Sequence, residues 1–200
     1  MSNVHRGYSL LILFLHFSST AIGQKISSTK NEVLIGHVRG FLHGHEVYRS
    51  DNFIHVQQFP SSLNIDHDGL VDSLTFLLGV DSMQHEKGIM DNGLSPANGM
   101  YWAWQSGYIF VKWEGYIQND NEKTMQPFTY HLGGFQYPFR CDQPLLAKLE
   151  AAKPLKKIQL SFEPTEKLIQ FVLASDFEIM SPQPAAVQMM KLFSQCLIVQ

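Results

Sequence analysis

Residues 99–115 read Gly-Met-Tyr-Trp-Ala-Trp-Gln-Ser-Gly-Tyr-Ile-Phe-Val-Lys-Trp-Glu-Gly and contain all three tryptophans of the chain. In an extended backbone alternate side chains point to the same face, so we expect Trp102 and Trp104 on one face of a sheet. Residues 106–107 permit a bend or bulge, and the residues after it alternate as in a mostly buried strand. The stretch therefore predicts a rigid aromatic core, because large rings contribute much of the energy of burial.

Short runs of β-branched and aromatic residues, separated by turn residues, recur along the chain. We expect them to form strands over residues 33–39, 46–49, 53–57, 72–78, 107–114, 127–132, 155–162, 168–174 and 197–199. Residues 83–98 are expected to form a long loop that leads into the tryptophan stretch. One helix is expected near the end, with Ser181 as N-cap, Pro182 at its first position and an end near Gln195. The sequence thus predicts an all-β fold, an antiparallel β-sandwich with one short C-terminal helix, in a single domain over residues 24–200.

The composition limits the classes of function. Hydrophobic residues make up 44% of the 200 residues and charged residues 16%, so the chain can form a core. The formal net charge is -3 and no basic run is present, which argues against a nucleic-acid partner. The sequence has no Gly-x-Ser-x-Gly, phosphate-binding glycine loop or His-Glu-x-x-His motif. We therefore expect a protein that is not an enzyme.

Residues 1–23 have the pattern of a secretory signal peptide. Arg6 supplies the charge, residues 10–17 the apolar segment, and residues 21–23 a small-residue cleavage site. The apolar segment is too short to span a bilayer, and no later stretch is long and apolar enough. We expect an exported protein, periplasmic or secreted, without a membrane span. Export also permits a disulfide between Cys141 and Cys196, with two buried unpaired thiols as the alternative.

Four segments occur in a characteristic order. They read Leu-Leu-Gly-Val-Asp-Ser at 77–82, Leu-Ser-Pro-Ala-Asn-Gly-Met-Tyr-Trp-Ala-Trp-Gln-Ser-Gly-Tyr at 94–108, Phe-Thr-Tyr-His-Leu-Gly-Gly-Phe at 128–135 and Ile-Met-Ser-Pro at 179–182. In these segments the chain resembles the MbnP-like family of periplasmic copper-binding proteins, which takes its name from methanobactin operons. The resemblance extends over residues 33 to 199.

The chain has nine histidines, a first indication of metal chemistry. His37, His43 and His45 cluster around the first hairpin, where His43 and His45 could hold a metal, although two histidines beside a glycine turn are usually exposed. His67 and His85 lie in polar loops and are interpreted as surface residues. His55 and His131 differ, because each lies inside an expected strand among apolar neighbours. Such a histidine is more often a core residue than a ligand, but these two match the strand histidines of the family pattern.

The resemblance implies that copper is held by two histidines and a tryptophan oxidised to kynurenine. On that basis the imidazole ligands are His55 and His131, and the modified residue is Trp102 or Trp104, between which the sequence does not choose. An intact indole offers only an N–H donor, whereas ring opening creates an aryl amine that can join two imidazoles around Cu(I). Trp113 is interpreted as a core residue.

The resemblance also implies a partner, a dihaem cytochrome c peroxidase-like enzyme that oxidises the tryptophan. The chain itself has no Cys-x-x-Cys-His haem attachment motif, so it would be the substrate of that enzyme. One alternative is a β-sandwich ligand-binding or adhesion module that holds no metal. Another is a hydrolytic enzyme, for which the sequence contains no supporting motif.

Overall fold

The computed structural model describes residues 25–65, 67–88, 90–102, 107–118 and 124–200. The expected signal peptide and Trp104 lie outside these ranges. The strands are β1 (Lys25–Leu42), β2 (His45–Ser50), β3 (Ile54–Val56), β4 (Ser61–Asn64), β5 (Leu70–Leu78), β6 (Tyr101–Trp102), β7 (Gly107–Tyr108), β8 (Val111–Gln118), β9 (Gln126–Leu132), β10 (Gln143–Pro154), β11 (Lys157–Phe162), β12 (Glu178–Ile179) and β13 (Leu197–Val199). The helices are α1 (Ser82–Glu86), α2 (Glu166–Ala174) and α3 (Pro184–Ser194), with short 3-10 turns η1 (Asn92–Leu94) and η2 (Pro96–Asn98).

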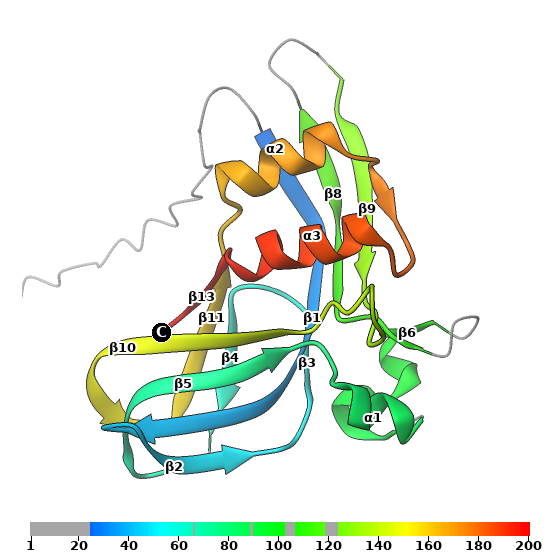
Figure 1. Ribbon diagram of the computed structural model, residues 1–200. Coiled ribbons are helices and arrows are strands. Elements are labelled where there is room, and N and C mark those ends of the chain that lie inside the picture. Colours follow the sequence, from blue (N-terminus) through cyan, green and yellow to red (C-terminus); the bar gives the residue numbers. More distant parts are fainter. Residues whose placement is uncertain (1–24, 66, 89, 103–106, 119–123) are drawn as a thin grey trace, which may run out of the picture.

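The long strand β1 connects two parts of the main sheet, whose order is β10-β5-β1-β8-β9-β12. Its first part pairs with β8, from Lys25 opposite Gln118 to Val33 opposite Val111, and its later part pairs with β5 and β2. β3 pairs with the middle of β1. Figure 1 shows β1 running beside β8 and then turning to lie beside β5. Apart from the short parallel pair of β12 with β9, the pairing is antiparallel, which confirms the predicted fold class.

The aromatic core lies between the main sheet and α3. Trp113 on β8 is fully buried, and its ring makes edge contacts with Phe128, Phe162 and Phe193 at centroid distances of 4.7, 5.5 and 5.9 Å. Its Nε1 atom donates a hydrogen bond to Ser28 Oγ at 2.8 Å. Figure 1 shows α2 and α3 lying across this side of β1, β8 and β9. The prediction that Trp113 is a core residue is confirmed.

The tryptophan stretch turns back on itself before β8 begins. In the two-stranded sheet of β6 and β7, Tyr101 pairs with Tyr108 and Trp102 pairs with Gly107. The bend expected at residues 106–107 lies partly outside the described residues, and β8 starts only at Val111. As a result Trp102 and Trp113 belong to different sheets.

Several elements differ from the expected ones. Residues 168–174 were expected to form a strand but lie in α2, whose buried residues follow a helical period and whose N-cap is Thr165. α3 begins two residues later than expected, with Gln183 as N-cap and Pro184 in its first turn. The expected loop over residues 83–98 contains most of α1 together with η1 and η2. No strand was expected over residues 143–154, where β10 forms the edge of the main sheet beyond β5.

The two cysteines are free and buried. Burial raises the pKa of Cys141 to about 12 and also raises the pKa of Cys196. Cys196 accepts a hydrogen bond from the backbone N–H of Thr165, which places its thiol at the start of α2. Of the two alternatives, the structure therefore contains the unpaired thiols.

In the part of the chain that the structure describes, no helix has the length and apolar character needed to cross a bilayer.

Candidate functional site

The candidate site is the face of the main sheet opposite to the Trp113 core, which we call the histidine face. It comprises His55 on β3, Lys30 and Glu32 on β1, Lys112 and Glu114 on β8, and His131 on β9. The strand register brings them together: Glu32 is the cross-strand partner of Lys112, and Lys112 is the partner of His131. Side chains of cross-strand partners share a face, and Trp113, one residue on from Lys112, points to the other.

His55 forms a pair with Glu32. The residue lies opposite Leu34 in the pairing of β3 with β1, so its ring reaches along the face to Glu32, two residues from Leu34. The distance from His55 Nε2 to Glu32 Oε2 is 2.7 Å. The side chain of His55 is 7% exposed and that of Glu32 is 16% exposed, so the pair is shielded from solvent.

His131 forms the same kind of pair with Glu114 on the adjacent strand, with 2.9 Å between Nε2 and Oε1. Burial lowers the pKa of His131 and outweighs the opposing effect of the Glu114 hydrogen bond. Burial alone would raise the pKa of Glu114, but the hydrogen bond from His131 and the charge of Lys30 lower it below its ordinary value. Both shifts favour a neutral imidazole that donates to an ionised carboxylate.

Two lysines connect the His–Glu pairs. Lys30 Nζ lies 3.8 Å from Glu32 Oε1 and 3.7 Å from Glu114 Oε1, so one ammonium group bridges both carboxylates. Lys112 stands between Glu32 and His131 in the register, and burial together with the charge of Lys30 lowers its pKa. Its Nζ atom lies 3.5 Å from the position that a Cβ atom on Gly99 would take. The lysine therefore reaches towards the segment that carries Trp102.

Trp102 approaches the histidine face at the end of β9. It is 1% exposed, and its Cζ3 atom lies 2.9 Å from the position of a Cβ atom on Gly133. Gly133 directly follows β9, the strand that carries His131. The indole of Trp102 thus packs at the end of that strand. Trp104, the other candidate, lies outside the described residues.

Two strands separate the predicted imidazole ligands. The register places β1 and β8 between β3 and β9, with His55 level with Leu34 and His131 level with Glu32. The Cα atoms of the two histidines are therefore three strand spacings across and two residues along the sheet from one another, about 16 Å in a flat sheet. Each ring leans inward, because each donates to a glutamate on the next strand. Among the described residues, no group of three or more His, Cys, Asp or Glu side chains is arranged to hold a metal ion.

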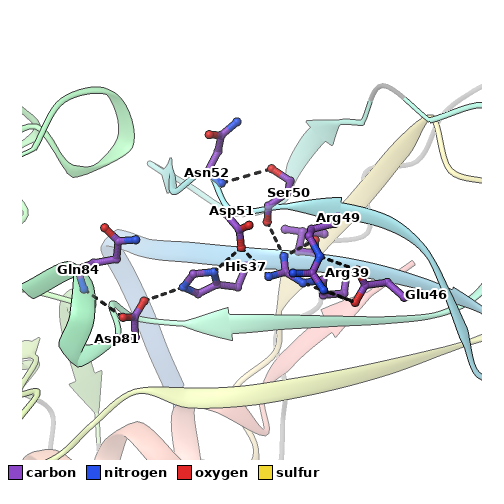
Figure 2. A network of polar contacts seen from close by, with 10 residues as sticks. His37, Arg39, Glu46, Arg49, Ser50, Asp51, Asn52, Asp81 and Gln84 are labelled. Atoms are coloured by element: carbon purple, nitrogen blue, oxygen red, sulfur yellow. Dashed lines mark hydrogen bonds and ion pairs between the residues drawn. The ribbon is translucent and has the colours of Figure 1, made fainter.

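His37 has a structural role in a separate polar network, which Figure 2 shows. Its Nδ1 lies 3.0 Å from Asp51 Oδ1 and its Nε2 lies 2.6 Å from Asp81 Oδ2. Asp51 also accepts from Arg39, and Asp81 caps α1 through the backbone N–H of Gln84. Hydrogen bonds from His37 and Arg39 lower the pKa of Asp51 to about 2. Because both ring nitrogens are engaged, His37 joins β1 to α1 and is not available to a metal.

The other histidines that were assigned to the surface divide into two groups. His43 and His45 are exposed, as expected. The surface assignment was wrong for His85, which is buried, stacks on Phe135 at 4.1 Å and makes an edge contact with Tyr108 at 5.1 Å. Burial lowers the pKa of His85 to about 4. His67 is partly buried, with its ring 5.3 Å from that of Tyr48.

Sequence reasoning missed the charged residues of the histidine face, because carboxylate pairing depends on strand register. One signal was present in the sequence. Lys112 and Glu114 alternate with buried Val111 and Trp113 in the tryptophan stretch, so one face of that strand is charged. A charged stripe on a strand whose other face is buried indicates a polar surface with partners on the neighbouring strands.

Comparison with protein-family models matches residues 14–181 to the family described as MbnP. Neither the comparison with curated proteins nor the comparison with solved structures gave a match. The matched range includes β1, β3, β8 and β9, and hence all of the histidine face. The match covers most of the chain and agrees with the resemblance of its four ordered segments, so the chain belongs to the MbnP family.

Proposed function

We propose that this protein is an exported copper-binding protein that holds Cu(I) on the histidine face. In this proposal the ligands are His55, His131 and an oxidised tryptophan, Trp102 or Trp104. The observation that supports it most is the shared face: the two histidines point to the same side of β3-β1-β8-β9. The Trp102 ring packs against Gly133, at the end of the strand that carries His131. Family membership adds the link to copper.

The donor atoms suit such an ion. Each imidazole uses Nε2 towards a glutamate, and among the described residues neither Nδ1 makes a hydrogen bond. Imidazole and amine nitrogens are good ligands for copper, whereas an intact indole has no lone pair to offer. Bound copper would supply a soft cation; the chain supplies two neutral rings and orients them through their carboxylate partners.

Binding one ion through both histidines sets a condition on the face. Metal–nitrogen bonds are about 2 Å long, far less than the separation of β3 from β9. Rotation of the two rings covers only part of this separation, so binding also requires the backbone of β3 or β9 to move inward over β1 and β8, where Lys112 stands in the metal-free protein. We propose that copper binding displaces the Lys112 ammonium from this position.

The tryptophan must be oxidised before it can act as a ligand, and we propose that a dihaem cytochrome c peroxidase-like enzyme does this outside the cytoplasm. The proposed signal peptide would deliver the chain to that compartment. Peptide mapping of the protein isolated with this enzyme would find kynurenine at position 102 or 104. Intact tryptophan at both positions, despite an active partner enzyme, would contradict this part of the proposal.

The experiment that tests the proposal is a Cu(I) titration against a chromophoric chelator, with native mass spectrometry to count bound ions. We expect one copper per chain in the protein isolated with its oxidised tryptophan. His55→Gln and His131→Gln should each weaken binding at least about tenfold, since each removes a ligand. His43→Gln, at an exposed position, should bind as the parent does. If the parent binds no copper, the metal-free ligand-binding or adhesion module is the better account.

A further inference from the structure

We infer that His37 is a pH-dependent link between the two walls of the cleft beside α1. As an imidazolium it binds Asp51 on one side of the cleft and Asp81 on the other, and as a neutral ring it can donate to only one of them. The inference goes beyond the proposed copper function and does not depend on it, because none of these residues belongs to the histidine face.

The cleft has a volume of about 550 Å³ and lies between two segments that are distant in sequence. One wall is formed by residues 51–54, between β2 and β3, and the other by residues of the segment 84–94, from α1 to η1. At the η1 end the walls are in direct contact, since a Cβ atom on Gly93 would meet the carbonyl oxygen of Phe53. At the α1 end they are connected through the ring of His37, which bonds to Asp51 and Asp81.

A β-bulge sets the direction of the His37 side chain. The register of β1 with β5 shifts between Gly36 and Arg39, and His37 between them has a left-handed backbone with φ 51°. Bulges redirect side chains, and a residue other than glycine keeps such a backbone only where its surroundings hold it. Figure 2 shows the His37 ring between the side chains of Asp51 and Asp81, which hold its two nitrogens.

The two hydrogen bonds require a positively charged ring. An ionised carboxylate only accepts hydrogen bonds, so Nδ1 at 3.0 Å from Asp51 and Nε2 at 2.6 Å from Asp81 must both carry hydrogen. Hydrogen bonds from His37 and Arg39 lower the pKa of Asp51 to about 2. Burial alone would raise the pKa of Asp81, but hydrogen bonds from His37 and the backbone of Gln84 bring it below its ordinary value. Both acids are therefore ionised at neutral pH.

The charges around the ring balance one another only while it is protonated. The charged and titratable groups that face the ring or its two acids come from several elements; they are Arg39 on β1, Glu46 on β2, Asp51, Asp81, His85 in α1 and Arg140. When His37 loses its proton, one nitrogen presents a lone pair to a carboxylate oxygen at hydrogen-bond distance, which is repulsive. One of the two bonds must then break, and the loss of either one disconnects the walls at the α1 end.

The test measures the width of the cleft in the mature chain. Nitroxide labels are attached to Asn52→Cys and Glu86→Cys, at exposed positions on either side, while the two native cysteines are buried. Electron paramagnetic resonance gives the label separation at about pH 5.5 and about pH 9, which span the range in which histidines commonly titrate. We expect the separation to increase by at least about 3 Å at the higher pH, because water enters between the parted groups. The pKa of His85, about 4, lies below this range.

Two variants separate His37 from other causes. An asparagine amide can accept from the charged ring and donate to the neutral one, so D51N should keep the walls together at both pH values. H43Q, at a position that is 83% exposed, should respond to pH as the parent does. Nitrogen-15 NMR of the unlabelled chain should show two N–H groups on the His37 ring at about pH 5.5 and one at about pH 9.

Equal label separations at the two pH values in the parent overturn the inference, and so does a single N–H on His37 at the lower pH. A response in D51N equal to that of the parent would show that another group opens the cleft, and it also overturns the inference. Copper titration has no bearing on these outcomes, so failure of the copper proposal leaves the role of His37 standing.

Discussion

The indole of Trp102 lies against Gly133, where a Cβ atom would stand 2.9 Å from Cζ3 of the ring and 2.4 Å from the carbonyl oxygen of Tyr108. The glycine connects two of the sequence segments that identify the family, 94–108 and 128–135. It lets the aromatic ring of Trp102 pack at the end of β9, the strand that carries His131.

Gly133→Ala should destabilise the protein by about 1–3 kcal/mol, because the added methyl group meets backbone as well as the indole. Urea unfolding followed by tryptophan fluorescence measures the loss, and the emission of the folded state should also change as Trp102 shifts. In Gly88→Ala the added Cβ atom meets nothing within 4 Å, so this variant should lose only the cost of an alanine at φ +80°, and its folded-state emission should equal that of the parent. Equal stability and emission in Gly133→Ala and the parent would contradict the packing described.

Acid should destabilise the protein through His85. The unfolded chain takes up a proton near the ordinary histidine pKa of 6.5, whereas in the folded protein burial lowers the pKa of His85 to about 4. The unfolded state therefore binds more protons in this window, and stability is lost as pH falls from 6.5 towards 4. At about 1.4 kcal/mol for each tenfold change in proton affinity, this loss is at most about 3 kcal/mol.

His85→Phe removes the titrating group and keeps an aromatic ring beside Phe135. Urea unfolding over this pH range should show a flatter dependence for His85→Phe than for the parent. His43→Gln, whose parent side chain is 83% exposed, should retain the parent's dependence. An identical pH dependence in His85→Phe and the parent would rule out His85 as the source.

The outcomes for particular residues explain what the sequence could reveal. Alternation in residues 111–118 and 126–132 was predictable, because burial on one face imposes a period of two. Residues 168–174 form a short apolar run whose length suits either a strand or a helix. In the folded protein they form part of α2, because this conformation buries Leu168, Ile169 and Val172. His85 has polar neighbours in sequence, and the rings that bury it lie 23 to 50 residues away.

In the candidate site, too, some residues could be predicted from the sequence and others depended on strand pairing. His55, His131 and either Trp102 or Trp104 were predicted by resemblance to the family, and the register brings the two histidines to one face. The roles of Glu32 and Glu114 required knowledge of which strands are neighbours. A carboxylate 23 residues from its histidine, or 17 as in the second pair, leaves no local pattern in the sequence.

Lys112→Leu should increase copper affinity about tenfold. Leucine removes a positive charge that stands next to His131, where cross-strand Cβ atoms are about 5 Å apart, and adds no donor atom that could bind Cu(I) itself. Lys148→Leu on β10 removes a charge at an exposed position away from the histidine face and should leave affinity unchanged. Chelator competition measures both variants. Weaker or equal binding in Lys112→Leu would show that the lysine does not oppose the metal.

Trp113→Phe should lower the stability of the protein without changing its copper affinity, which distinguishes a core tryptophan from one at the proposed metal site. The smaller ring leaves a void among Phe128, Phe162 and Phe193 and loses the hydrogen bond to Ser28, so we expect a loss of about 1–3 kcal/mol. Copper affinity should remain that of the parent, because Trp113 points to the opposite face of β8. A variant that loses copper while keeping its stability would assign Trp113 to the metal site.

The most direct test of the copper proposal is X-ray diffraction from crystals of the copper-loaded protein, with anomalous data collected at the copper absorption edge. We predict a single strong anomalous peak on the histidine face, bonded to the imidazoles of His55 and His131 and to the amine of an oxidised Trp102 or Trp104, with Lys112 moved aside. A peak bound by other residues, or by one of these histidines without the other, would contradict the account.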